Sequence, residues 1–505
     1  MSTIGKKPSG LTTRGKLILI VLVIGVIAGV YFGFKDKIQS TMGEATAGDV
    51  IKIGVVTWPG YVGGQYMNNG FVPTTNCRFF KDYGIQVEFK VLDDFLASRK
   101  AFENGEVDLL WCTVDALPTE FGSKGTLVSY LPKLIFQADW SRGGDAIVVR
   151  TGIETVSDLK GKTVAVAQGT PSHSFLIDLL NTNSLTVNDI KINFTASAID
   201  AANLFKQQAV DAAVVWSPDD ADCVTKVSGS KILSSTKTAT HIIADGFIAK
   251  EDYVLANEDK LRKLYEGWMI GNAEINMNTN GAKQKAAKIL ADKFQMKESD
   301  ALASMNNVRY VTHGDNINFF GLGDIKSVTG DALYSKMAGV YSRLGMTDSP
   351  ISWRDASYAN LVKTTNLTGA GHSPEPQMVF SEITEDVKTK KEFSDKKVTI
   401  NFNTGAYELT GDAKFMINKE FSDILKTYQG ARIRIEGNTD NTGNPKSNQI
   451  LSEKRAQSVK DYLISEFGVD PNRIIVIGNG PKHAIAAGVN GSSEEYRRTD
   501  FQLVE

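Results

Sequence analysis

The chain has 505 residues, of which 42% are hydrophobic and 23% charged, and its formal net charge is −2. This length exceeds what one hydrophobic core can serve, so two or three domains are expected. The nearly balanced charge excludes a general electrostatic attraction to nucleic acid. The three cysteines, Cys77, Cys112 and Cys223, have no CxxC spacing, so no zinc site is expected and at most one disulfide could form.

Residues 17–34, LILIVLVIGVIAGVYFGF, are uncharged and predict a membrane-spanning helix. At about 1.5 Å per residue they would extend about 27 Å, close to the thickness of a bilayer core. Four basic residues and no acidic ones precede this run, which predicts that residues 1–16 are cytoplasmic and the bulk of the chain lies outside. The alternative is a cleaved signal peptide, because residues 45–47, ATA, resemble a cleavage site. The distance of that site from the apolar run favours an uncleaved anchor.

Residues 49–365 alternate short apolar runs with helical patterns, which is typical of a mostly parallel α/β sheet. The predicted strands are Ile51–Thr57, Gln86–Leu92, Val107–Cys112, Asp145–Val149, Thr163–Ala167, Lys191–Phe194 and Ala212–Trp216. Helices are predicted between them, for example at 94–103, 172–181, 199–207 and 258–277.

Polar loops follow several of these strands, at 57–66, 111–118, 167–175 and 216–222. Ligands of open α/β sheets bind outside the carboxyl ends of the strands. Free N–H groups at the helix start near residues 170–173 favour an anion or a carbonyl oxygen. Tryptophans in these loops could form flat walls of a pocket, although a tryptophan after a strand is more often part of the core. His173 is likewise more often a surface or capping residue.

This block resembles the periplasmic substrate-binding proteins of ABC importers, in the nitrate, sulfonate and taurine branch. The phrases that carry the resemblance are IKIGVVTWPGY, AFENGEVDLLWCTVDALP, DWSRGGDAIVVR, VSDLKGKTVAVAQGTPSHSFLIDLL and DAAVVWSPD. The resemblance implies a lobe from 50–138 with 236–365, a second lobe from 145–230, and crossings near 131–145 and 231–248. The helix start at Thr170–Ser172, which is expected to face the other strand-end loops, predicts a small polar, anionic solute. The implied pocket residues are Trp58, Tyr61, Thr113, Asp115, Asp139, Ser141, Thr170, Ser172, His173, Trp216 and Asp219. Arg142 stands where a small or polar residue is expected.

No catalytic set appears in this block, which favours a binding protein without a cofactor or metal over an enzyme on the same fold. The five histidines are scattered, and there is no HExxH, GxSxG or GxxxxGK[ST] motif. Asp219, Asp220 and Asp222 are close together, but a solvated helix start explains them better than a metal site.

Residues 366–396 are polar and contain prolines, so they are predicted to form a linker before a smaller domain at 397–505. As a flexible coil such a linker would reach roughly 30 Å, and about 100 Å when stretched. The small domain is predicted to be an α+β sandwich with its helices on one face. Its expected strands are 397–409, 431–438, 472–480 and 497–505, and its expected helices are 415–429 and 448–467.

Asp440, in a loop, and Arg455, in the following helix, are predicted to face one small space. An acid beside a guanidinium suits a zwitterion that carries an amine and a carboxylate. The alternative is a plain salt bridge between the two residues that shapes the loop.

This stretch resembles the OmpA-like peptidoglycan-binding family. The residues that carry the resemblance are Thr439, Asp440, Asn441, Gly443, Asn448, Leu451, Ser452, Arg455, Ala456, Val459 and Leu463. The resemblance implies that Asp440 and Arg455 clamp the diaminopimelate of a stem peptide. The implied peptidoglycan-binding residues are Thr439, Asp440, Asn448, Leu451, Arg455 and Arg497. Asn438 stands where the family usually has histidine, and Tyr496 where it usually has asparagine.

Together these features predict a periplasmic solute-binding protein that has one inner-membrane anchor and is tethered to peptidoglycan. An ABC importer with an inner-membrane permease is the expected partner. The alternative is a ligand sensor or scaffold of an envelope-stress or defence complex without transport.

Overall fold

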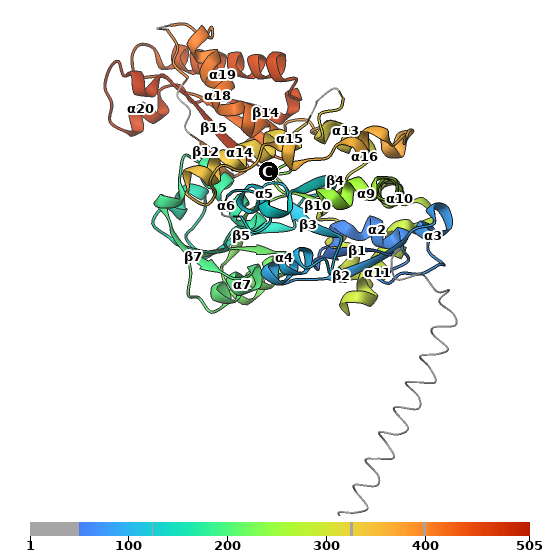
Figure 1. Ribbon diagram of the computed structural model, residues 1–505. Coiled ribbons are helices and arrows are strands. Elements are labelled where there is room, and N and C mark those ends of the chain that lie inside the picture. The colour runs from blue at the N-terminus through green and yellow to red at the C-terminus, as the bar shows by residue number, and fades with distance from the viewer. Residues whose placement is uncertain (1–49, 124, 324–326, 397–399, 404, 505) are drawn as a thin grey trace, which may run out of the picture.

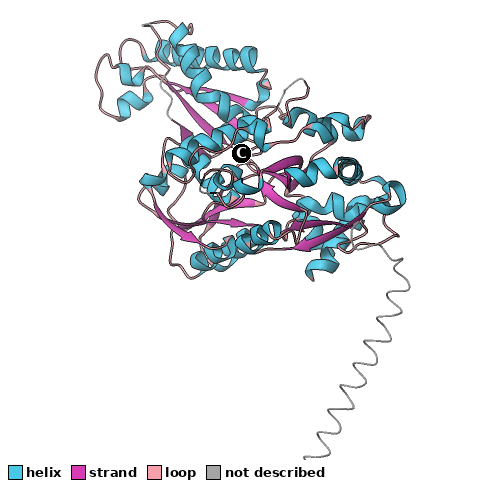
Figure 2. Ribbon diagram, viewed as in Figure 1, coloured by secondary structure: helices cyan, strands magenta, loops and turns pink. Residues whose placement is uncertain are grey.

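The computed structural model describes residues 50–123, 125–323, 327–396, 400–403 and 405–504. The predicted anchor at 17–34 lies outside these residues. No helix in the described part of the chain combines the length and hydrophobicity that a bilayer crossing requires. Three sheets, each flanked by helices, form the described structure (Figure 2).

The first sheet has six strands in the order β11-β4-β10-β3-β1-β2. The strands are β1 (Val50–Val55), β2 (Gln86–Val91), β3 (Leu109–Thr113), β4 (Pro132–Ser141), β10 (Ala244–Lys250) and β11 (Val308–Tyr310). β1 is parallel to β2 and β3, whereas β10 is antiparallel to β3 and β4. Its α-helices are α2 (Val62–Met67), α3 (Arg78–Tyr83), α4 (Phe95–Glu103), α5 (Leu117–Glu120), α9 (Glu251–Ala256), α10 (Glu258–Met277), α11 (Ala282–Phe294), α12 (Glu298–Met305), α13 (His313–Phe319), α14 (Gly330–Arg343), α15 (Trp353–Ala356) and α16 (Asn360–Thr364). Short 3-10 turns are η1 (Pro59–Tyr61), η2 (Val128–Tyr130), η5 (Thr279–Gly281) and η6 (Ala370–His372).

The second sheet has five strands in the order β7-β6-β8-β5-β9. These are β5 (Asp145–Val149), β6 (Thr163–Ala167), β7 (Lys191–Thr195), β8 (Ala212–Trp216) and β9 (Lys231–Ser235). Its helices are η3 (Val156–Leu159), α6 (Pro171–Thr182), η4 (Val187–Asp189), α7 (Ala198–Lys206) and α8 (Asp219–Lys226). The apolar strands are buried on both faces, as expected for a sheet covered by helices on each side.

The chain crosses between the two sheets at 142–144, between β4 and β5, and returns at 236–243, between β9 and β10. Both passages lie within the ranges predicted for crossing strands. The lobes built around the two sheets are therefore joined by two short segments. The junction between the lobes lies beside these segments and is called the cleft below.

The third sheet has the order β12-β15-β13-β14 and is covered by two long helices. The strands are β12 (Glu392–Lys396), β13 (Arg432–Gly437), β14 (Ile474–Gly478) and β15 (Thr499–Val504). The α-helices are α17 (Glu385–Thr389), α18 (Gly411–Thr427), α19 (Pro445–Phe467) and α20 (Lys482–Ala486), with η7 (Pro471–Arg473) and η8 (Glu494–Tyr496) between them. The predicted α+β order is confirmed, with one exception in its first strand.

The strand expected at 397–409 is wrong for the residues described there, because 400–403 and 405–409 form no strand. The first strand is instead β12, which pairs with β15. Ile400 and Phe402 are nevertheless buried, so the alternating pattern reflects packing into the core without a hydrogen-bonded ladder.

The segment 366–396 does not behave as the free linker that its composition suggests. Its last residues are strand β12, and an earlier stretch lies on the first lobe. Thr312 Oγ1 donates to Ser373 O at 2.8 Å, and Glu375 accepts two hydrogen bonds from Arg142 at 2.8 and 3.1 Å. These contacts hold the start of the segment on the first lobe. The segment therefore does not extend as a flexible coil.

The third sheet and its helices, orange to red in Figure 1, lie against both lobes. Lys336 on α14 of the first lobe contacts Asp178 on α6 of the second lobe at 2.5 Å and Asp423 on α18 at 2.7 Å. The backbone N–H of His241, in the second crossing, donates to Thr427 O at 3.2 Å. The C-terminal unit is thus packed against both lobes and the segment that joins them.

Candidate functional site

Three neighbouring strands of the first sheet place polar side chains in one row beside the cleft. Asp245 on β10 is the register partner of Asp139 on β4 and of Thr113 on β3. Directly opposed residues of antiparallel strands project from the same face, so the two carboxyls are close neighbours. Trp58 Nε1 donates to Asp139 at 3.2 Å, and the Tyr61 hydroxyl donates to Asp245 Oδ1 at 2.6 Å.

The second lobe contributes Asp145, which opens β5 and is the register partner of Trp216 on β8. Ser141 Oγ donates to Asp145 Oδ2 at 3.1 Å, and Ser172 Oγ lies 3.5 Å from Oδ1. Trp216 Nε1 donates to the same Ser172 Oγ at 2.8 Å. Ser141, at the end of β4, and Ser172, in the first turn of α6, therefore both face the Asp145 carboxyl.

Asp115, just after β3, is fully buried, and neither of its carboxyl oxygens has a hydrogen-bond partner. The hydroxyl of Thr113, which is 4% exposed, also lacks a partner. Among the described residues, no lysine, arginine or histidine forms an ion pair with Asp115, Asp139, Asp145 or Asp245. The cleft therefore concentrates acidic groups without a basic counterpart.

The pKa values of these four carboxyls are all raised, chiefly because burial penalises the charged form. Burial raises the pKa of Asp115 and of Asp145 to about 7, and that of Asp139 to about 8. The pKa of Asp245 lies well above its ordinary value, through burial and then the repulsion of Asp139. Repulsion between the carboxylates also contributes. The charge of Asp145 raises the pKa of Asp139, and the charge of Asp115 raises the pKa of Asp145.

Eight of the predicted pocket residues gather at this cleft, and three have other surroundings. The eight are Trp58, Tyr61, Thr113, Asp115, Asp139, Ser141, Ser172 and Trp216. Thr170 Oγ1 donates to Ala167 O at 2.8 Å within its own loop. His173 packs edge-on against Phe194, and burial lowers its pKa to about 4. Asp219 lies 3.7 Å from Lys206, at the start of α8.

The side chains that the cleft offers to the expected anionic solute are acidic and not basic, and the charge of the solute stays a prediction. At the start of α6, Pro171 has no N–H, and the N–H groups of His173 and Ser174 donate to Thr170 O. Arg142 also points away from the cleft: it binds Thr240 O at 2.9 Å and the carboxylate of Glu375. Two N–H groups of the helix start are thus already bonded, and its Ser172 hydroxyl faces the Asp145 carboxyl.

Sequence analysis missed Asp145 and Asp245, which complete the acidic set. Both are single acids within apolar strands, DAIVV and ADGFIAK. A buried acid in such a strand needs a partner. That isolation is the signal that could have identified them.

In the C-terminal unit, the loop after β13 holds Asp440 at the start of a network of hydrogen bonds. Arg497 Nη1 lies 2.8 Å from Asp440 Oδ2, and the N–H groups of Thr442 and Ser493 donate to the carboxylate at 3.2 Å. Burial alone would raise the pKa of Asp440, but these donors hold it below its ordinary value. Asp440 is therefore a stable, buried anion.

Arg455 is carried by α19, which begins after the cap Asn444, with Pro445 in its first turn. Only 1% of Arg455 is exposed, and the guanidinium donates to Ala406 O at 3.0 Å and Asn403 O at 3.3 Å. Burial and then Arg497 lower its pKa, while Asp440 raises it. The two residues are close but form no ion pair, because Asp440 pairs with Arg497. The simple Asp440–Arg455 salt bridge is therefore not the arrangement found.

The other residues implied for peptidoglycan binding surround this pair. Asn448 Nδ2 donates to Thr442 O at 2.9 Å and holds the loop on the helix. Thr439 is buried with no partner for its hydroxyl, and Leu451 is half-buried on α19. Together they form a small polar site with one acid and two guanidinium groups.

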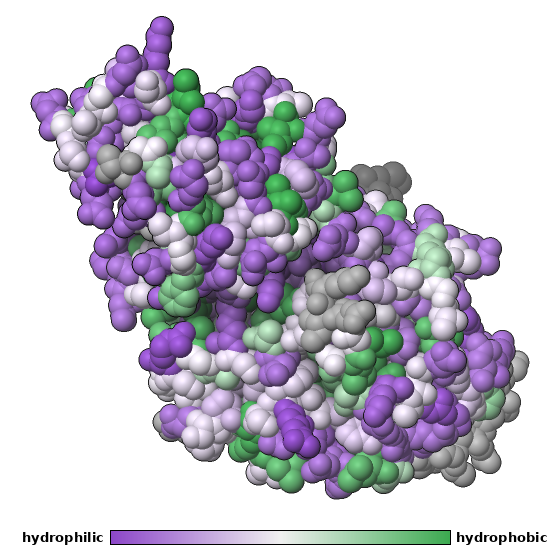
Figure 3. Space-filling view, turned by 90° about the horizontal axis from the view of Figure 1, so that it is seen from above, coloured by the Kyte–Doolittle hydropathy of each residue, from purple (hydrophilic) through white to green (hydrophobic). Residues whose placement is uncertain are grey.

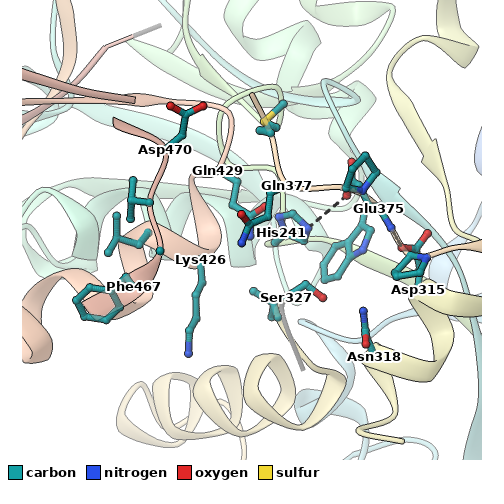
Figure 4. Close-up of a pocket in the computed structure, with 18 of the residues that line it drawn as sticks. His241, Asp315, Asn318, Ser327, Glu375, Gln377, Lys426, Gln429, Phe467 and Asp470 are labelled. Carbon is teal, nitrogen blue, oxygen red and sulfur yellow. Dashed lines mark hydrogen bonds and ion pairs between the residues drawn. The ribbon is translucent and has the colours of Figure 1, made fainter. Parts of the chain in front are cut away.

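A separate cavity of about 750 Å³ lies where the C-terminal unit meets the first lobe. Figure 4 shows His241, Asp315 and Glu375 on one side and Lys426, Phe467 and Asp470 on the other. Its lining belongs to neither the cleft nor the Asp440 loop. On the face seen in Figure 3, hydrophobic residues are scattered among hydrophilic ones.

Comparison with known proteins identifies two families in different parts of the chain. Residues 401–498 match the OmpA family, and residues 75–275 match the family described as NMT1/THI5 like. Outer membrane protein Omp38 of Acinetobacter baumannii is 32% identical over 171 residues, 34% of this chain and 43% of Omp38. The peptidoglycan-associated lipoprotein of Haemophilus influenzae is 30% identical over 90 residues, 18% of this chain and 58% of the lipoprotein. The chain thus spans about half the length of these curated relatives.

Among solved structures, the periplasmic aliphatic sulphonate binding protein SsuA of Escherichia coli aligns with a TM-score of 0.49 and 17% identity. The alignment covers 63% of this chain and all of SsuA. The family matches thus place an NMT1/THI5-like region at residues 75–275 and an OmpA-like region at residues 401–498.

Proposed function

We propose that this protein is a solute-binding protein of the cell envelope whose C-terminal domain binds peptidoglycan. The observation that carries the proposal is the convergence of side chains from both lobes in one cleft. Asp139 comes from the first sheet and Asp145 from the second, and only two short segments join the lobes. A hinged pair of lobes with a polar cleft can close around a small molecule.

Peptidoglycan binding is supported by the arrangement around Asp440. A stable carboxylate can take an ammonium group, and the guanidinium of Arg455 has N–H groups left for a carboxylate. The two charges thus suit the zwitterionic end of diaminopimelate. The name of the Haemophilus influenzae relative, a peptidoglycan-associated lipoprotein, supports the same proposal.

The basic flank and the apolar run at 17–34 support a single inner-membrane anchor with the bulk of the chain in the periplasm. Alkaline phosphatase fused after residue 50 should therefore be active. An inactive fusion would contradict this orientation.

An ABC importer with an inner-membrane permease is the partner that this function requires. The rival function is a ligand sensor or scaffold without transport. Uptake of a radiolabelled cleft ligand, compared between wild-type cells and cells lacking the gene, separates the two. Loss of uptake supports import, whereas unchanged uptake supports sensing.

The wall-binding part is tested by sedimenting the full chain with purified sacculi that contain diaminopimelate. We expect the protein in the pellet, and release by free diaminopimelate. A protein that stays in the supernatant would contradict the peptidoglycan proposal.

A further inference from the structure

We propose that the cleft binds a short organic cation with a positive charge at both ends, such as an aliphatic diamine. This inference rests on the proposed solute-binding function and adds the chemical class of the solute. It replaces the anionic class that was predicted from the helix start at Thr170–Ser172.

The first argument is charge. Asp115, Asp139, Asp145 and Asp245 are each at most 5% exposed. Their hydrogen-bond donors are an indole, a phenol and two serine hydroxyls, which satisfy oxygens without cancelling charge. Buried carboxylates are stable when a cation is their partner. No such partner is found in the described part of the chain.

The second argument is an unfilled set of acceptors. Among the described residues, no hydrogen bond of good geometry reaches either oxygen of the fully buried Asp115, although the hydroxyls of Ser174 and Thr113 are near enough to lower its pKa. The Thr113 hydroxyl has no hydrogen-bond partner there either. Thr113 is the register partner of Asp245, so its side chain shares the face that carries the acids. Buried polar groups without partners mark places where a ligand supplies the missing bonds. Asp115 needs hydrogen-bond donors, and an ammonium group of the ligand provides them.

The third argument is the distribution of the acids over the two lobes. Asp115, Asp139 and Asp245 belong to the first lobe, and Asp145 belongs to the second. A ligand that is positive at both ends can contact carboxyls of both lobes and favour their closure. Trp58 and Trp216 are half-buried beside Asp139 and Asp145, and their faces can cover methylene groups or an ammonium.

A metal ion fits this cleft less well. No group of three or more acid, histidine or cysteine side chains in the described residues is arranged to hold one. Asp139 and Asp245 are already turned toward the indole of Trp58 and the phenol of Tyr61. The carboxyls are therefore spread around the cleft and do not converge on one point.

The test uses the purified full chain and isothermal titration calorimetry. Putrescine, n-butylamine and butane-1,4-diol have four carbons and carry two, one and no positive charges. We expect affinity to fall at least tenfold at each step. Sulfate, nitrate, ethanesulfonate, Mg²⁺, Ca²⁺ and Zn²⁺ are titrated in parallel and should give no heat at the same concentrations.

Asp139→Asn and Asp145→Asn should each weaken putrescine binding at least tenfold. Asp108→Asn is the matched control, because Asp108 accepts a hydrogen bond from Lys52 N at 2.8 Å at the opposite end of β3. It should bind putrescine like the wild type. Because the ligand series needs no variant, the inference is also tested if a substitution prevents folding.

Three outcomes overturn the inference. Binding of an anion but not of putrescine, lost in Trp216→Ala, leaves the solute-binding function intact and rejects the cationic class. Binding of a metal ion alone rejects an organic cation. No binding by any compound contradicts both this inference and the proposed solute-binding function.

Discussion

The cleft and the Asp440 loop both hold buried charges, but they balance them in opposite ways. In the cleft, four carboxyls face one another and their donors are neutral. In the loop, one carboxylate lies 2.8 Å from Arg497 and near Arg455, so acid and base are already mixed. The contrast predicts that the cleft is unstable until a cation enters, whereas the loop is stable in advance of its ligand.

The largest expected effect is the pH dependence of the cleft. Asp115, Asp139 and Asp145 keep their protons in the folded state up to a pKa of about 7 or 8, whereas the unfolded chain loses them near 3.8. The pKa of Asp245 is raised in the same direction. Unfolding then releases protons, so the free energy of unfolding falls as pH rises through this window. At 1.36 kcal/mol per pKa unit, the part of this loss that falls above pH 6.5 is on the order of several kcal/mol.

The decline should be measured between pH 6.5 and 8.5 by thermal unfolding of the unliganded full chain. Burial lowers the pKa values of three buried histidines, His173, His241 and His313, and of the half-buried His372, so their opposite contribution to stability ends near pH 6.5. Tyr61 faces the same acids, but its raised pKa keeps it protonated. The doubly substituted Asp139→Asn Asp145→Asn protein should show a clearly shallower decline. Equal slopes in the two proteins would contradict the raised pKa values.

The next effect in size concerns the loop. Asp440→Asn keeps the shape of the side chain but removes the charge that an ammonium requires. We expect sacculus binding to weaken by about 2–4 kcal/mol, because a charged ligand group is left unpaired. Asp461→Asn, on the exposed side of α19, is the control and should bind like the wild type.

Binding and melting temperature must be measured together for these variants. If Asp440→Asn melts earlier and binding declines only as far as folding does, Asp440 shapes the loop and does not contact peptidoglycan. Arg455→Ala should weaken binding too, but it also removes hydrogen bonds to Ala406 O and Asn403 O, so some loss of stability is expected.

How much of this could be predicted from sequence differs between the two regions. Local sequence patterns predicted most helices and strands. For example, the strand Asp145–Val149 and the helix 258–277 have the predicted bounds. The pair Asp440 and Arg455 was found because a loop and the next helix bring them together. The charge of the cleft was not predicted, because it depends on the position of β10 between β3 and β4. That position brings Asp245 opposite Asp139. Such long-range register cannot be read from composition.

The segment 366–396 was misjudged for a related reason. Its composition is that of a flexible linker, yet Glu375 contacts Arg142, which comes more than two hundred positions earlier. The family resemblance predicts a small or polar residue at the position of Arg142. It instead joins the two crossings and this segment, because its Nε also donates to Thr240 O.

A smaller effect is expected from breaking that contact. Glu375→Gln removes the charge that pairs with Arg142, and it should lower the free energy of unfolding by about 1–2 kcal/mol because the pair is partly buried. Limited proteolysis should also cut the 366–396 segment faster. Glu385→Gln is the control, since its pair with Lys388 is exposed and contributes little. Equal proteolysis of the two variants would show that Glu375 does not hold the segment in place.

The smallest expected effect comes from Trp58→Phe, which separates the aromatic wall of the cleft from its hydrogen bond. Phenylalanine keeps a flat apolar face but removes the N–H that donates to Asp139 at 3.2 Å. That bond lowers the pKa of Asp139 against the effect of burial, so its loss should raise the pKa further. A single hydrogen bond of this kind contributes about 1 kcal/mol. Putrescine binding at pH 7 should therefore weaken about fivefold and recover at pH 8.5, where Asp139 can ionise again. Weakening that is the same at both pH values would mean that Trp58 acts by contact with the ligand and not through the charge of Asp139.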